Sequence, residues 1–424
     1  MLRLYPSLQA LDPQRRDWLL KNRVSVSLAW LAGAVVLFTI FDRTPISNIP
    51  TLRTVAGVFG VALGLIWAFS RARTFRLRKG PLGWLVLMIA ATLYVELSRY
   101  ASGGTFTLSN FIQWFQALIF ALILIDICRD YRSVSLLLWA SGLALCVVAI
   151  LGLAGEEGVQ GRAGAETFNL NVQAYYYGLA AIGLLVNVLY RWPRIGLAGL
   201  LSLIGVVLMF MLMVRTGSRG GLAATLVGIA WVLFFMLRKR NVSAYVMIIP
   251  IILAVGALLF LSSDAVLRWE RTLAGEDYGY RDVIWGAALD MFRDSPILGH
   301  GGGFIVPLGE LTRGVNTSTH NQYLMLMLAY GLVGLLIWLA LMRSVFMRCW
   351  AYRAHPSAIA CMGMILSTMV FGVGGDLTFN RYYWVLVAVA ANIHVLCLAF
   401  PVTYQMNRGR PMQYGSRFSK VAAE

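Results

Sequence analysis

The sequence has little charge. Only 13% of its 424 residues are Asp, Glu, Lys or Arg, whereas 59% are hydrophobic. A soluble domain usually has about 25% charged residues, so this composition excludes an ordinary soluble globular fold. Uninterrupted apolar runs of about 20 residues recur along the chain, and each is long enough to cross a bilayer as a helix. The sequence therefore predicts an all-α, polytopic membrane protein.

The sequence also lacks paired cysteine motifs and a cleavable leader. No CxxC pair and no disulfide framework is present, which favours small buried thiols. Residues 1–23 are polar and mixed, so the first apolar span is expected to act as an insertion signal and to remain in the chain. The cysteines, which lie in or at the ends of apolar runs, are Cys128, Cys146, Cys349, Cys361 and Cys397.

Several catalytic signatures are missing. There is no DxD, no HExxH and no histidine–carboxylate cluster at metal-ligand spacing, so no metal or cofactor is expected. The glycine run at 299–303 is not followed by GK[ST] and is not a phosphate-binding P-loop. There is no GxSxG nucleophile motif. No pair of acids lies mid-membrane, as a proton-coupled transporter would usually require.

The apolar runs predict about twelve transmembrane spans. A transmembrane domain would cover residues 24–402, between a cytoplasmic segment 1–23 and a cytoplasmic tail 403–424. The long external loop 263–319 would form a helical subdomain between spans 9 and 10. The predicted spans are 24–41, 51–69, 82–98, 107–127, 133–153, 173–190, 195–214, 219–237, 244–262, 320–342, 357–375 and 382–402.

Charge is distributed unequally between the two sets of loops. The set containing both termini carries 24 of the 36 Lys and Arg residues but only 5 of the 19 Asp and Glu residues. The positive-inside rule therefore predicts that both termini are cytoplasmic. The excess charge would meet anionic membrane lipids, and this spread over many loops excludes nucleic acid as the expected partner.

The long external loop contains an apolar pattern of helical period. Residues 280–292 place Val283, Ile284, Ala287, Ala288 and Met291 on one face, which predicts an amphipathic helix on the membrane or on the bundle. Pro296 and the glycine-rich turn after it are expected to end this segment.

Arginines flank short polar stretches on the external side. Arg215 and Arg219 enclose a Thr-Gly-Ser turn, and Arg281 follows Tyr280 on the amphipathic helix. Arginine forks suit phosphate, and a helix N-terminus adds free N–H donors. Two other readings stay open. Arg215 could snorkel to the interface, and Arg281 could pair with a carboxylate such as Asp277.

His320 lies where the polar stretch before the tenth span ends. It could be a hydrogen-bonded residue of the helix start or a general base, since histidine titrates near neutral pH. Thr317, Ser318 and Thr319 could cap the helix themselves, so capping does not require His320. His300, between glycines, favours a structural turn role. Arginines that neutralise a diphosphate, with a histidine that deprotonates a hydroxyl, suit a lipid-linked pyrophosphate donor.

An ordered set of four segments resembles the O-antigen ligase family and its wider superfamily, which includes O-antigen polymerases and protein O-oligosaccharyltransferases. The segments lie between residues 160 and 340 in the family's order. They are "RAGAETFNLN", "TGSRGG", "YRDVIW" followed by "SPILGHGGG", and "HNQYL" followed by Gly331 and Gly334.

The resemblance implies a fold similar to the C-type glycosyltransferases and a periplasmic active site on the bacterial inner membrane. The donor would be an undecaprenyl-pyrophosphate-linked glycan and the acceptor a sugar hydroxyl of lipid A–core. His320 would be the general base, while Arg219, Arg281 and the adjacent Arg215 would bind pyrophosphate. Looser candidates for the site are Arg162, Asn171, Tyr280, Asn321 and Asp376.

Other functions remain open at this point. A polymerase or a protein O-oligosaccharyltransferase would use the same donor. A transporter for lipid-linked glycans is the alternative of a different class. It would be expected to have inverted repeats or polar interruptions near mid-membrane, and the sequence has few.

Overall fold

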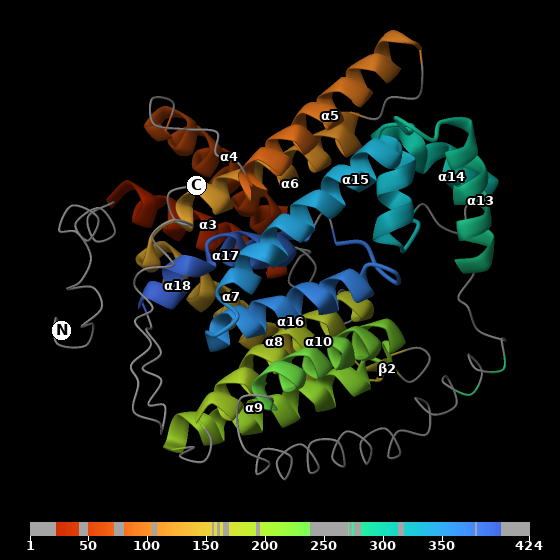
Figure 1. The fold of residues 1–424 in the computed structure, drawn as a ribbon. Coiled ribbons are helices and arrows are strands. Elements are labelled where there is room, and N and C mark those ends of the chain that lie inside the picture. The colour runs from red at the N-terminus through yellow and green to blue at the C-terminus, as the bar shows by residue number, and fades with distance from the viewer. Residues whose placement is uncertain are drawn as a thin grey trace.

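The computed structural model describes residues 23–41, 50–71, 80–103, 108–154, 157–158, 162–163, 169–191, 196–237, 270, 274, 281–312, 318–377 and 380–399. These residues are helical almost throughout (Figure 1), as the sequence predicted. The exception is one pair of two-residue strands, β1 (Glu157–Gly158) and β2 (Arg162–Ala163), which pair in antiparallel register.

Helices occupy eleven of the twelve predicted spans. The ninth, at 244–262, lies outside the described residues. Six described helices are long and apolar enough to cross a membrane, or seven if one pair bent by 61° counts as a span. The number twelve therefore stays a prediction. The helices are α3 (Arg23–Phe41), α4 (Pro50–Arg71), α5 (Pro81–Ala101), α6 (Leu108–Ile127), α7 (Tyr131–Ala154), α8 (Leu170–Arg191), α9 (Gly196–Arg215), α10 (Arg219–Leu237), α15 (Gln322–Ala351), α16 (Pro356–Phe371) and the bent pair α17 (Arg381–Ala391) and α18 (Ile393–Ala399).

The helices pack in groups that combine helices from both halves of the sequence. Helices α8 and α10 contact α16, and α9 packs on α8, whereas α5, α6 and α15 lie on the other side of α16 (Figure 1). Helix α3 packs on α4 and α7, and α17 contacts α6 and α15. The apolar sequence explains the mixed burial, because bilayer-facing side chains need not be covered by protein. Examples are Trp139 and Phe69, which are 78% and 85% exposed.

The segment before α15 contains α13 (Arg281–Asp294), η4 (Gly302–Phe304) and α14 (Ile305–Leu311). Three of the five residues predicted for the apolar face of α13 are buried, namely Ile284, Ala288 and Met291. Val283, at the edge of that face, is 49% exposed. The helix is amphipathic as expected, but its buried stripe is narrower than the sequence pattern.

Helix α15 is broken at Tyr330 and Gly331, where the backbone leaves helical geometry and Gly331 has a φ of 62°. The glycine-rich segment 296–301 lies against this break, so the chain itself satisfies the backbone groups that the break releases. The four hydrogen bonds run from His300 N–H to Leu328 O (2.6 Å), Gly301 N–H to Ala329 O (2.8 Å), Leu332 N–H to Pro296 O (2.9 Å) and Val333 N–H to Ile297 O (3.3 Å).

Two charged side chains of α5 hold the same segment. The guanidinium of Arg99 donates to the Ser295 hydroxyl (2.6 Å) and to the Gly299 carbonyl (3.1 Å from Nε). The N–H of Gly302 donates to the buried carboxylate of Glu96. An imidazole nitrogen of His300 lies 2.7 Å from the Met291 carbonyl, which agrees with the structural role predicted for this histidine. The C-terminal end of α13 is therefore fixed to α5 and α15.

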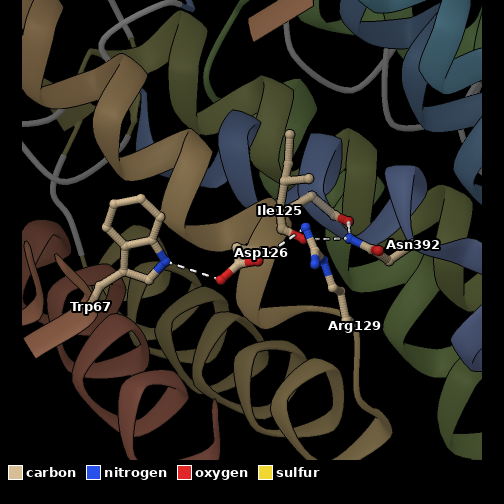
Figure 2. A network of polar contacts seen from close by, with 6 residues as sticks. Trp67, Ile125, Asp126, Arg129 and Asn392 are labelled. Carbon is tan, nitrogen blue, oxygen red and sulfur yellow. Dashed lines mark hydrogen bonds and ion pairs between the residues drawn. The ribbon is translucent and has the colours of Figure 1, made fainter. Parts of the chain in front are cut away.

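The opposite end of α6 carries a separate polar network (Figure 2). The Asp126 carboxylate accepts a hydrogen bond from the indole N–H of Trp67 (3.1 Å) and pairs with Arg129 (3.0 Å). Asn392, at the bend between α17 and α18, donates to the carbonyl of Ile125 (2.9 Å). These contacts join α4, α6 and the bent pair far from α13.

The break in α15 gives a prediction for stability. A Cβ at residue 331 would lie 2.1 Å from the Ile297 carbonyl oxygen, and the positive φ disfavours any side chain. We expect Gly331→Ala to destabilise the protein by about 2–4 kcal/mol, measured as a lower melting temperature in detergent. Gly142→Ala is the matched control, because a Cβ there has open space within a helix. Equal melting temperatures for the two variants would contradict the packing described.

Candidate active site

His320 lies immediately before α15 in a strained backbone conformation. Its φ is 47°, and it is the one non-glycine residue with a positive φ in the part of the chain that the structure describes. The left-handed region costs an L-residue roughly 1–2 kcal/mol, so it persists where neighbouring contacts enforce it. Strain of this kind is frequent at functional sites.

Asn321 caps α15. Its side-chain oxygen accepts hydrogen bonds from the N–H groups of Tyr323 (2.9 Å) and Leu324 (3.1 Å). The sequence reasoning had assigned the cap to Thr317, Ser318 or Thr319, and this was wrong. A cap must precede the helix directly, and the helix begins at Gln322 rather than at His320. The conclusion that capping does not need the imidazole still holds.

Contacts from two other segments hold the residues around His320. The indole N–H of Trp285, on α13, donates to the carbonyl of Thr319 (3.0 Å). The N–H of Gln322 donates to the carbonyl of Gly372 (2.7 Å), and its side-chain oxygen accepts from the N–H of Leu377 (2.8 Å). His320 therefore lies between α13 and the turn that follows α16.

Arg281 is the first residue of α13 and reaches the same turn. Its guanidinium donates to the carbonyl of Gly374 at 3.2 Å. Burial lowers the pKa of the His320 imidazole below its usual value of about 6.5, and the nearby positive charge of Arg281 lowers it further. Both effects favour the neutral imidazole, which is the form that can accept a proton.

Asp376 belongs to the turn 372–377 and is half-buried. The two hydrogen bonds of Gln322 to Gly372 and Leu377 tie this turn to the start of α15. The structure therefore connects four predicted site residues through neighbouring segments: His320, Asn321, Arg281 and Asp376.

Arg215 ends α9 and Arg219 begins α10, with a Thr-Gly-Ser turn between them. The Ser218 hydroxyl accepts from the N–H of Gly221 (3.2 Å) and so caps α10. Thr216 donates to the carbonyl of Met213 (2.6 Å) and closes α9. The Thr216 and Ser218 side chains therefore form hydrogen bonds with backbone groups. Arg215 and Arg219 are only partly buried.

Helices α8 and α10 run side by side in the same direction. A Cβ on Gly221 of α10 would lie 2.5 Å from the Cβ of Ala174, and Gly178 of α8 meets Thr225 one turn further along. Asn171, in the first turn of α8, therefore lies at the same end as the start of α10.

Helix α16 runs against α10 in the opposite direction. Gly363 faces Val232, whereas Gly228 also reaches Ser367 further along α16. The start of α10 consequently lies toward the end of α16, where the turn with Asp376 begins. Arg219 and the group around His320 thus share one end of the bundle, and helix N-termini there add positive dipole ends.

Two of the predicted residues receive no side-chain description. Tyr280 lies outside the described residues, and Arg162 is described only as backbone in β2. Their site roles remain predictions.

Three residues at this end were not singled out from the sequence. Trp285 and Gln322 lie within the quoted segments "YRDVIW" and "HNQYL", but the contacts that involve them join distant parts of the chain. Arg381 begins α17, whose cap Asn380 accepts from the hydroxyl of Tyr176 on α8 (2.7 Å). Arg381 could have been found from the sequence, because it follows a capping residue at a helix start shortly after Asp376.

No group of three His, Cys, Asp or Glu side chains that could hold a metal ion occurs within the described ranges. The charged group that acts on His320 is the guanidinium of Arg281, a group that can bind diphosphate oxygens directly.

The fold and this site define a multi-pass membrane protein with arginines and one histidine gathered at helix starts. A protein-family model described as "O-Antigen ligase" matches residues 204–339. A protein of Pseudomonas aeruginosa named "O-antigen ligase" is 26% identical over 178 residues, which is 42% of this chain and 41% of that relative. These two matches support the resemblance to the O-antigen ligase superfamily, and the aligned region spans less than half of the named relative.

The environment of His320 predicts how its imidazole titrates. We expect a pKa below about 6.5 in the intact protein, and a higher value in Arg281→Gln because one cause of the lowering is removed. Nuclear magnetic resonance of labelled histidine in detergent measures both. Arg293→Gln is the control, since Arg293 is exposed near the other end of α13 and pairs with Asp290. A pKa unchanged by Arg281→Gln would contradict the described electrostatics.

Proposed function

We propose that this protein is an O-antigen ligase. It transfers O-antigen polysaccharide from undecaprenyl pyrophosphate to a sugar hydroxyl of lipid A–core at the periplasmic face of the inner membrane, and its termini are cytoplasmic. The observation that supports this best is a connected group of contacts. Arg281 and Gln322 both bond to the turn after α16, and Trp285 bonds to the residue before the strained His320. The family match adds the class of reaction.

In the proposed reaction, His320 is the general base. Its neutral imidazole accepts the proton of the acceptor hydroxyl as that oxygen attacks the anomeric carbon of the lipid-linked glycan. The new bond joins the acceptor oxygen to the anomeric carbon, and the bond from that carbon to the pyrophosphate oxygen breaks. Undecaprenyl pyrophosphate leaves with the electron pair, and the proton remains on His320.

The lowered pKa of His320 suits this role in one respect and opposes it in another. Burial and Arg281 keep the imidazole neutral at pH 7, so the base form dominates. The same effects weaken its basicity, which an acceptor hydroxyl held close to it must compensate. In this proposal Asp376, on the adjoining turn, orients His320 or a sugar.

Arginines neutralise the leaving group in this proposal. Arg281 and Arg219 each stand at the first residue of a helix, so guanidinium and helix N–H groups can face the same anion. Arg215, across the Thr-Gly-Ser turn, extends the positive charge. Because these groups are preorganised in a partly buried site, they stabilise the charge that develops on the pyrophosphate without a metal ion.

The helix breaks bear on the transporter alternative. The sequence reasoning found few interruptions, but the structure has breaks at Tyr330–Gly331 and at Asn392. In transporters the ends of broken helices bind substrate. Here the segment 296–301 occupies the first break, and Asn392 at the second donates to Ile125. The segment 296–301 and the Asn392 side chain therefore make contacts within the protein at these breaks, which favours an enzyme over a transporter.

A direct test incubates purified protein with the lipid-linked glycan and lipid A–core, in the presence of EDTA. We expect glycan on lipid A–core with the native protein and at least a hundredfold lower rate with His320→Asn. Asparagine tolerates a left-handed backbone, so this variant should still fold. Longer lipid-linked chains without labelled lipid A–core would indicate a polymerase instead. Normal transfer by His320→Asn would remove the base from the mechanism.

A further inference from the structure

Helix α13 makes two contacts, four residues apart, with the segments that enclose the site. The Arg281 guanidinium donates to Gly374, and the Trp285 indole donates to Thr319. Residues at i and i+4 lie on one face of a helix, so a single face of α13 touches both the turn with Asp376 and the residue before His320. Helix α13 carries Arg281, which is proposed to bind the pyrophosphate, and it also contacts the segment that carries the base His320.

The acceptor of the Trp285 hydrogen bond, the Thr319 carbonyl, is directly linked to the backbone of His320. The carbonyl of Thr319 belongs to the peptide plane that joins Thr319 to His320. Because that plane is rigid, rotating it changes the φ of His320. A hydrogen bond to this carbonyl at 3.0 Å therefore acts on the torsion that is strained at 47°.

The other end of α13 is held by contacts with α5 and α15. Arg99 of α5 holds Ser295 and Gly299, and the segment after them is bonded into the break of α15. Helix α13 is thus a short helix of 14 residues, with its C-terminal end bonded to α5 and α15 and its N-terminal end at the site. Its Trp285 lies about 6 Å along the helix axis from Arg281.

We infer that Trp285 is a positioning residue that holds the His320 backbone through the Thr319 carbonyl and thereby aligns the base with an anion bound at Arg281. This inference rests on the proposed function. Trp285 itself is only half-buried, and its indole N–H is used on the backbone rather than offered to a ligand. Arg281 on α13 is the charged group that acts on the imidazole, so a misaligned segment changes the distance between the two.

The test compares Trp285→Phe, which keeps an aromatic ring but removes the N–H donor, with the control Trp139→Phe. Trp139 is 78% exposed on α7. In Trp285→Phe we expect kcat to fall about threefold to tenfold, with the KM for the lipid-linked donor unchanged. The His320 pKa, followed by magnetic resonance, should rise toward its usual value as the imidazole leaves its buried place beside Arg281. Neither kcat nor the His320 pKa should change in Trp139→Phe.

The outcomes separate the two ideas. If the native protein transfers glycan and His320→Asn does not, but Trp285→Phe matches Trp139→Phe in kcat and in His320 titration, the positioning role is wrong and the proposed function stands. If Trp285→Phe shifts the titration of His320 while the native protein transfers nothing, the positioning role stands and the proposed function fails. A loss of melting temperature without a shift in titration would show that Trp285 only supports the fold.

Discussion

The left-handed backbone at His320 is the constraint around which this end of the molecule is organised. A non-glycine residue does not keep that conformation unaided, so the segments beside it must supply the compensating contacts. Helix α13 supplies one through Trp285, and the turn after α16 supplies two through Gln322. The same elements carry Arg281, whose charge acts on the imidazole, and Asp376. Strain, hydrogen bonding and charge are therefore parts of one arrangement, and a change in any of them is expected to alter the others.

That arrangement depends on an anchor further along α13. The break in α15 leaves backbone groups unpaired in an apolar surrounding, and the segment 296–301 pairs with them. Glu96 and Arg99 of α5 then fix this segment from the outside. The glycines at 299 and 331 permit the close approach, since each has a positive φ and stands against backbone atoms of the other segment. The candidate site is thus built on contacts between α5, α13 and α15.

The sequence predicted the helices better than it predicted the site. Long apolar runs predicted α5, α8 and α10 closely, because hydropathy alone sets the position of such helices. The cap of α15 was assigned wrongly, because local pattern does not give the exact helix start. The strain at His320 and the role of Trp285 depend on hydrogen bonds between residues 34 positions apart. No local pattern encodes those contacts, although the residues themselves lay in segments that the family resemblance had identified.

The central claim is that the arginines bind the diphosphate while the histidine acts only in transfer. Binding of undecaprenyl pyrophosphate to the purified protein, measured by calorimetry in detergent, tests this division directly. The account predicts an unchanged Kd for His320→Asn and a Kd raised at least about tenfold for Arg281→Gln and for Arg219→Gln, since removing one partner of a partly buried charge pair is costly. An affinity lost in His320→Asn, or retained in both arginine variants, would contradict it.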